Sequence, residues 1–104
     1  MSKRLEAIEK VLAAGSKDPT HWYMRAMELR SLARHDEALA AFGELEATHG
    51  AYVPTYLMAA QLCSELGRTG EARGWAERGQ ARARAAGDGH ALSELTTFLA
   101  TLGS

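Results

Sequence analysis

The chain has 104 residues, 46% of them hydrophobic, with a formal net charge of −1 and a pI near 6.4. This length suits one domain with a buried core, and the nearly neutral charge gives no general attraction to nucleic acid or to a membrane surface. The single cysteine, Cys63, excludes an internal disulfide. The charged start, MSKRLEAIEK, precedes no apolar run long enough for a signal peptide or a membrane span, so we expect a cytoplasmic protein.

The whole chain is predicted to be helical. Its only two prolines are at positions 19 and 54, and no segment alternates β-branched and polar residues as a strand would. The predicted helices cover residues 3–14, 19–33, 36–48, 54–66, 70–86 and 89–102. Because only a few residues connect them, successive helices should be antiparallel neighbours.

Capping signals support these boundaries. Asp18 precedes Pro19, which is favourable at the first position of a helix, and Asp36 and Asp88 are predicted to cap two later helices. Glycines stand where helices should end. They are Gly15, Gly50, Gly67, Gly87 and Gly103.

An internal repeat appears when the chain is shifted by 34 residues. The stretch RHDEALAAF, which begins at Arg34, then aligns with RTGEARGWA, which begins at Arg68. On the preceding helices Trp22 aligns with Tyr56, and Ala26 aligns with Ala60. The first helix aligns by the same shift, and the last helix aligns if two residues are inserted before it. Four helical units in one register indicate a repeat protein.

This register resembles the tetratricopeptide repeat (TPR), a helix–turn–helix unit of 34 residues. The matching residues are Trp22, Ala26, Leu29, Ala38 and Phe42, then Tyr56, Ala60, Cys63, Gly67, Ala72 and Gly79. The resemblance covers nearly the whole chain. It implies an all-α fold, an α-α superhelix of about six antiparallel helices that forms a single domain over residues 1–104. The repeats would lie at about 19–52 and 53–88, with flanking helices at 3–14 and 89–102.

The departures from the family pattern are few. Arg25 occupies a slot usually given to Leu, Ala76 replaces an aromatic residue, and Leu45 stands where a small residue is usual. Gly79 matches a small packing slot, but Gly43 and Gly74 lie inside predicted helices without a packing reason.

The resemblance also implies a concave groove lined by the first helix of each repeat. On the predicted helix 19–33, one face carries the residues expected in the core. A second stripe of side chains lies about a quarter of a turn around the helix from that face, and residues 54–66 carry a counterpart of it. The implied groove residues are Tyr23, Met24, Met27, Arg30, Leu57, Met58, Gln61 and Ser64. Methionine suits adaptable contact surfaces, so the expected function is binding of a peptide or an amphipathic helix. Alternatively, the stripe is simply part of the core.

A second functional hypothesis is a homo-oligomerisation or scaffold unit. The last predicted helix ends in the apolar residues Phe98, Leu99 and Leu102, on which another copy could stack. Binding of a peptide's C-terminal carboxylate, as in one TPR subclass, is disfavoured because the chain has no Asn and its Lys residues are only at positions 3, 10 and 17. The arginines of residues 68–84 are not interleaved with aromatic residues, so no nucleic-acid partner is expected.

No motif for catalysis is found in the sequence. The four histidines have no metal-ligand spacing, Cys63 has no CxxC partner, and no serine lies in a GxSxG turn. We therefore expect a non-catalytic protein with no metal and no cofactor, and we expect Cys63 to be a small core residue.

Overall fold

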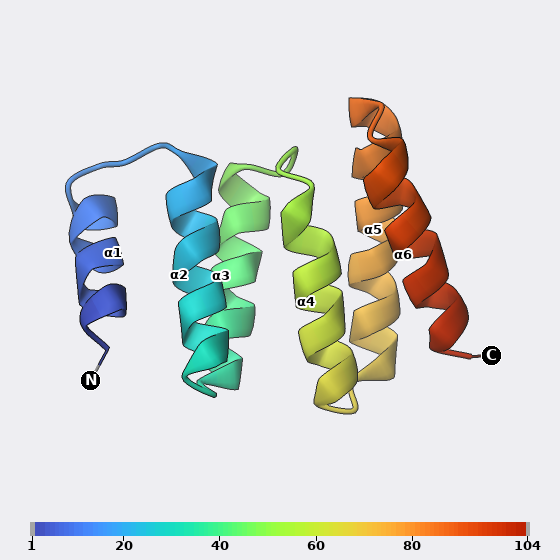
Figure 1. The fold of residues 1–104 in the computed structure, drawn as a ribbon, viewed down its shortest axis with the longest axis horizontal. Helices are drawn as coiled ribbons and strands as arrows, with labels where there is room; N and C mark the ends of the chain where they lie inside the picture. The colour runs from blue at the N-terminus through green and yellow to red at the C-terminus, as the bar shows by residue number, and fades with distance from the viewer. Residues whose placement is uncertain (1, 104) are drawn as a thin grey trace. The chain divides into compact units, whose positions relative to one another are not determined.

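The computed structural model describes residues 2–103, which form six α-helices and no strand (Figure 1). The helices are α1 (Lys3–Ala13), α2 (Pro19–Ser31), α3 (His35–Thr48), α4 (Pro54–Glu65), α5 (Thr69–Ala86) and α6 (Gly89–Thr101). All six predicted helices are confirmed, and their ends agree with the prediction to within two residues.

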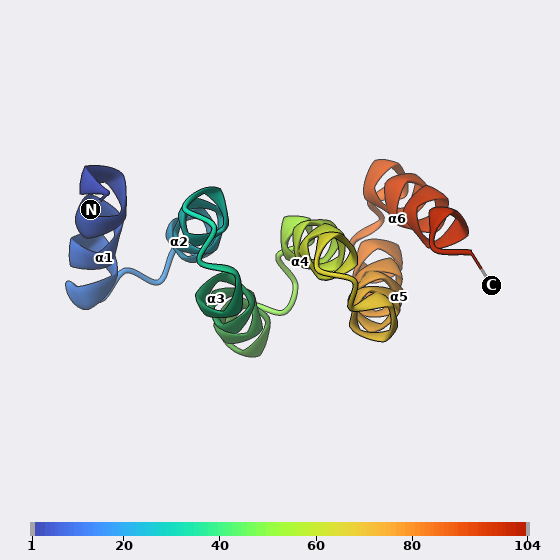
Figure 2. The same cartoon turned by 90° about the horizontal axis from the view of Figure 1, so that it is seen from below.

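These residues fall into two compact units, which divide between His49 and Gly50. In the first unit, α2 packs against both α1 and α3. In the second, α5 packs against α4 and α6, and α4 also contacts α6. Successive helices within each unit run antiparallel, as the short connections predict (Figures 1 and 2). That residues 1–104 act as one domain stays a prediction.

Two of the predicted N-caps are confirmed. The Asp18 carboxylate accepts a hydrogen bond from the Thr20 N–H at 2.9 Å, with Pro19 in the first turn of α2. Asp88 accepts from the Ala91 N–H at 3.0 Å and so caps α6. Each side chain satisfies a backbone donor that the first turn of a helix leaves without a partner.

The prediction of Asp36 as an N-cap is wrong. Helix α3 begins one residue earlier, at His35, because the Arg34 carbonyl already accepts a helical bond from the Ala38 N–H at 2.9 Å. Asp36 therefore lies in the first turn, where its negative charge still suits the helix dipole. Arg34 has no side-chain oxygen for a cap, and its guanidinium instead donates to Glu37 at 2.6 and 2.8 Å.

Helices α2 and α4 end in the same way. In α2, the residue after the C-cap is Ala33, with φ of 59°, and in α4 it is Gly67, with φ of 75°. Both ends are closed by N–H groups bonding back to carbonyls in the last turn, the pattern of a Schellman motif. The bonds run from Ala33 to Arg30, Arg34 to Leu29, Gly67 to Ser64 and Arg68 to Cys63.

The buried residues follow the repeat register. The predicted core slots that are buried are Ala26, Leu29, Ala38 and Phe42 in the first unit and Tyr56, Ala60, Cys63, Ala72, Ala76 and Gly79 in the second. Small side chains at these positions let helices approach closely. A Cβ added to Gly79 would lie 2.5 Å from the Tyr56 Cβ and 3.0 Å from a Leu95 methyl carbon, which confirms the small packing slot.

Candidate functional site

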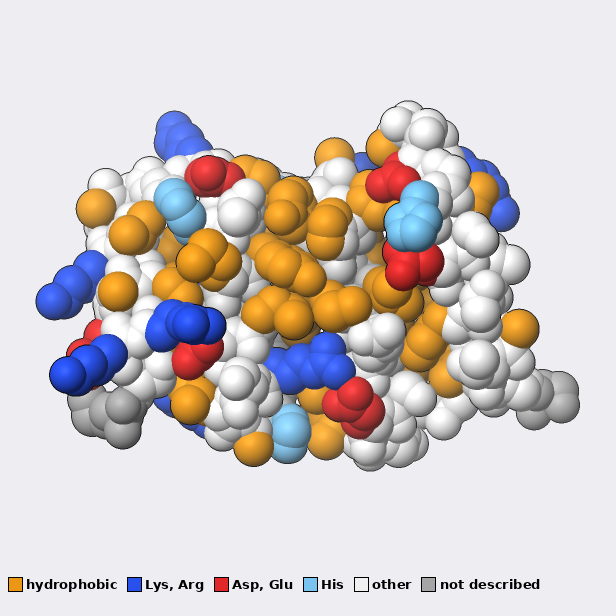
Figure 3. Space-filling view, viewed as in Figure 1, with side chains coloured by type: hydrophobic (Ala, Val, Ile, Leu, Met, Phe, Trp, Pro, Cys, Tyr) orange, Lys and Arg blue, Asp and Glu red, His pale blue; other side chains and the backbone are white. Residues whose placement is uncertain are grey.

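In the first unit, the predicted groove residues all lie on α2. Tyr23, Met27 and Arg30 are half-buried, and Met24 is 42% exposed. None of them is among the fully buried residues of the hydrophobic core. Hydrophobic side chains are visible over α2 in Figure 3.

In the second unit, the predicted residues lie on α4. Leu57, Met58 and Gln61 are half-buried, and Ser64 is exposed. Two of them, Leu57 and Gln61, line an open hollow of about 350 Å³, which we call the α4–α6 groove. Its remaining lining residues come from α6 and are His90, Ser93, Glu94, Thr97, Phe98 and Thr101.

The α6 side of this groove is absent from the predicted set, although the repeat register contained the signal for it. With the two-residue insertion needed to align the last helix, Ser93 and Thr97 are the counterparts of Leu57 and Gln61. The same stripe therefore continues from α4 onto α6.

The α4–α6 groove combines an apolar floor with a polar rim. Leu57 and Phe98 are partly buried and pack on the core cluster of the second unit. On the rim, the His90 Nε2 lies 3.2 Å from a carboxylate oxygen of Glu94. Such a surface can hold an apolar side chain and hydrogen-bond the groups beside it.

A second, more apolar hollow lies between α1 and α2. It has a volume of about 230 Å³ and includes Met24 among its lining residues, together with Ala7, Ile8, Val11 and His21. Val11 and Met24 are 40% and 42% exposed. The structure thus places Met24 beside residues of α1, a neighbour that the stripe on α2 did not predict.

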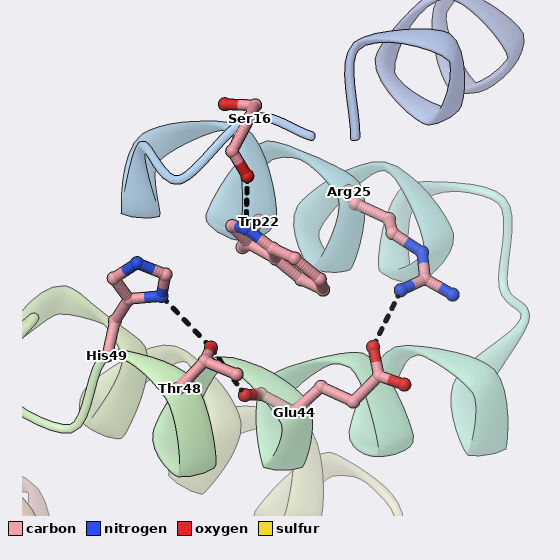
Figure 4. A network of polar contacts seen from close by, with 6 residues as sticks. All are labelled: Ser16, Trp22, Arg25, Glu44, Thr48 and His49. Atoms are coloured by element: carbon pink, nitrogen blue, oxygen red, sulfur yellow. Dashed lines mark hydrogen bonds and ion pairs between the residues drawn. The ribbon is translucent and has the colours of Figure 1, made fainter. Parts of the chain in front are cut away.

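A polar network connects α2 with α3 in the first unit (Figure 4). Arg25 donates to Glu44 at 2.8 Å, and Thr48 donates to the Glu44 carbonyl at 2.8 Å. At the start of α2, the Trp22 indole donates to the Ser16 carbonyl at 3.3 Å. The bond to Glu44 gives Arg25, which occupies a slot usually given to Leu, an acceptor on α3.

Residues that could carry chemistry are sparse. Within residues 2–103, no group of three or more His, Cys, Asp or Glu side chains is arranged to hold a metal. Cys63 is buried, as predicted, and burial raises the pKa of its thiol, so the reactive thiolate is disfavoured. Among the helices of this range, none is both long and apolar enough to span a membrane.

Solved structures of similar fold identify the family. A solution structure of a tetratricopeptide repeat domain protein from Salinibacter ruber is 34% identical to this chain, with a TM-score of 0.79. The match covers 83% of this chain and 87% of that one. The chain belongs to the tetratricopeptide repeat family. The predicted family and the all-α fold are thus confirmed.

Two further structures agree. A crystal structure of a TPR domain protein from the same organism is 34% identical to this chain, with a TM-score of 0.76. The match covers 82% of this chain and 96% of that one. A solution structure of a Bordetella parapertussis protein is 24% identical to this chain and shares the fold, with a TM-score of 0.82. That match covers 98% of this chain and 89% of the other. No protein-family model matches the TPR chain. No curated protein matches it either.

Proposed function

We propose that this TPR protein is a non-catalytic interaction module that binds a peptide or an amphipathic helix of a protein partner in the α4–α6 groove. The observation that supports this most directly is the open hollow of about 350 Å³, which two first helices of successive repeats line together. A concave surface with apolar and polar groups side by side is the usual form of a ligand site.

The groove chemistry suits a peptide. Leu57 and Phe98 offer an apolar floor for one large side chain, while Gln61 and Thr97 add polar groups that can bond to a peptide backbone. Because Leu57 and Phe98 already pack on the core, the floor is held in place before a ligand arrives, and less entropy is lost on binding.

The α2 stripe is proposed as a second contact surface, in the first unit. Met24 and Met27 can adapt their shape to an apolar ligand. Tyr23 and Arg30 are of the residue types that are enriched among binding hot spots. All four are at least partly exposed, as a binding surface requires. In the second unit, Met58 and Ser64 of α4 are proposed to extend the contact surface of that unit, although they do not line the α4–α6 groove.

Blocking the groove tests this function. Thr97 is exposed and lines the groove, so Thr97→Trp should fill it without disturbing the core. Ala81→Trp, at an exposed position of α5 outside the groove, is the matched control. We expect wild type and Ala81→Trp to capture the same partners from cell extract and Thr97→Trp to lose them. Equal capture by all three proteins would show that the groove is not the site.

The α2 stripe needs its own variant. Met27→Glu places a charge in the middle of the stripe and should weaken capture if this surface is used. If Met27→Glu captures as wild type does while Thr97→Trp fails, binding is confined to the second unit.

A homo-oligomerisation unit is the second candidate function. It is favoured by the apolar hollow between α1 and α2, with Val11 and Met24 exposed beside it. The predicted apolar end of the last helix contributes less to such a contact, since Phe98 and Leu99 are partly buried in their own unit. Sedimentation over a concentration range decides: a monomer at every concentration excludes this candidate. The cytoplasmic location stays a prediction.

A further inference from the structure

The two helices that line the α4–α6 groove carry charge of one sign only. Neither α4 nor α6 contains a Lys or an Arg. Their acidic residues are Glu65, at the end of α4, and Glu94, which lines the groove and has a side chain 50% exposed. The arginines of the second unit lie on and just before α5 and do not line the groove.

The neighbours of Glu94 leave this negative charge largely in place. His90 lies 3.2 Å from it, but its side chain is 87% exposed, and it offsets the carboxylate only when it is protonated. At the same rim, the Thr101 hydroxyl donates its proton to the Phe98 carbonyl at 2.6 Å. The oxygen of Thr101 is therefore left as a hydrogen-bond acceptor.

We propose that the α4–α6 groove selects a basic peptide segment, with a Lys or Arg next to a large apolar side chain. The apolar side chain would lie on Leu57 and Phe98, and the cation would pair with Glu94. The Thr101 hydroxyl, about two helical turns further along α6, would accept a separate hydrogen bond from the peptide. Complementary charge across an interface gives specificity, and an acidic segment would bring like charges together. This inference rests on the proposed function, because it names the chemistry of the ligand for the same groove.

Three dye-labelled peptides test the selection. They share one amphipathic scaffold of Leu, Ala and Gln and carry Lys, Gln or Glu at the same positions. We expect the Lys peptide to bind about two- to fivefold more tightly than the Gln peptide, as for a partly exposed ion pair, and the Glu peptide to bind least well. The preference should shrink at high salt, because exposed charges are screened.

Variants assign the preference to one residue. Glu94→Gln should remove the difference between the Lys and Gln peptides, whereas Glu77→Gln, which removes an exposed carboxylate on α5 outside the groove, should keep it. Backbone chemical-shift changes in α4 and α6 report binding in the groove in every case.

The outcomes separate the two proposals. If all three peptides bind with equal affinity and shift the signals of α4 and α6, the charge selection is wrong and the groove remains the binding site. If the selection persists in Glu94→Gln, Glu94 is not its cause and the inference is overturned. If no peptide shifts these signals at the highest soluble concentration, both the inference and the proposed function are contradicted.

Discussion

Gly79 lies on α5 close to the side chains of Tyr56 and Leu95. An added Cβ would come within 2.5 Å of Tyr56 and 3.0 Å of Leu95, both of which are buried. We expect Gly79→Ala to lower the free energy of unfolding by about 1–3 kcal/mol, as overpacking of a core does. Urea unfolding measures this change.

Gly43 is the matched control for Gly79. It also lies inside a helix, α3, but a Cβ there would meet nothing within 4 Å. Gly43→Ala should therefore raise the free energy of unfolding by up to about 1 kcal/mol, because alanine loses less backbone entropy on folding. Destabilisation of both variants to the same extent would contradict the assignment of Gly79 as a packing residue.

Asp18 makes stability depend on pH. The backbone and side-chain hydrogen bonds from Thr20 hold the pKa of its carboxyl below the ordinary value of 3.8. A carboxyl with a lowered pKa in the folded state stabilises the protein above its unfolded pKa, and this contribution is lost as the pH falls through the folded pKa.

Asp18→Asn isolates that contribution, since asparagine caps a helix equally well but does not titrate. When the pH is lowered from neutral to below 3.8, we expect the Tm of wild type to fall further than the Tm of Asp18→Asn. A Tm difference between the two proteins that stays constant with pH would show that the ionised carboxylate contributes nothing.

At the scale of the helix, the ends of α2 and α4 share one hydrogen-bond pattern but differ in one residue. Ala33 has φ of 59°, which strains a residue with a Cβ, whereas Gly67 adopts 75° without strain. Ala33→Gly should raise the free energy of unfolding by about 1 kcal/mol, and Gly67→Ala should lower it by a similar amount. Thermal unfolding of both variants checks this, and changes of equal sign would contradict it.

The helices could be predicted because their signals are local or periodic. Asp18 and Asp88 carry capping oxygens, and glycines such as Gly67 follow the helix ends. The predicted start of α3 is one residue late because the first helical bond is made by the Arg34 carbonyl, which accepts from the Ala38 N–H. The side chain of Arg34 is not a capping type, so the sequence carries no signal for this start. Likewise, the left-handed conformation of Ala33 is dictated by the shared helix end and not by the residue type.

The candidate site could be predicted only in part. The register groups Leu57 and Gln61 on one stripe of α4, since a helix fixes which residues share a face, and both line the α4–α6 groove. The register does not predict which helix packs beside each stripe. Met24 lies beside α1 and Leu57 beside α6, and such neighbours depend on packing between helices.

At the scale of the molecule, stability in a repeat protein is the sum of the repeats and the contacts between neighbours. Leu95 is 1% exposed and joins α6 to the core cluster that includes Tyr56 and Ala76. Leu95→Ala should lower the free energy of unfolding by about 2–5 kcal/mol. Helix α6 should then unfold locally more often than the other helices. Hydrogen exchange should then accelerate most in α6, with less effect on α1–α3. Uniform acceleration along the chain would contradict this local role.

The proposed function requires that the α4–α6 groove hold a segment of a partner protein. Site-specific photo-crosslinking can detect this contact, with a photoreactive amino acid at Thr97, inside the groove, or at Ala81, outside it on α5. We predict that a partner protein is cross-linked from position 97 in cells and not from position 81. Cross-linking from position 81 alone, or equal cross-linking from both positions, would show that the groove does not hold the partner.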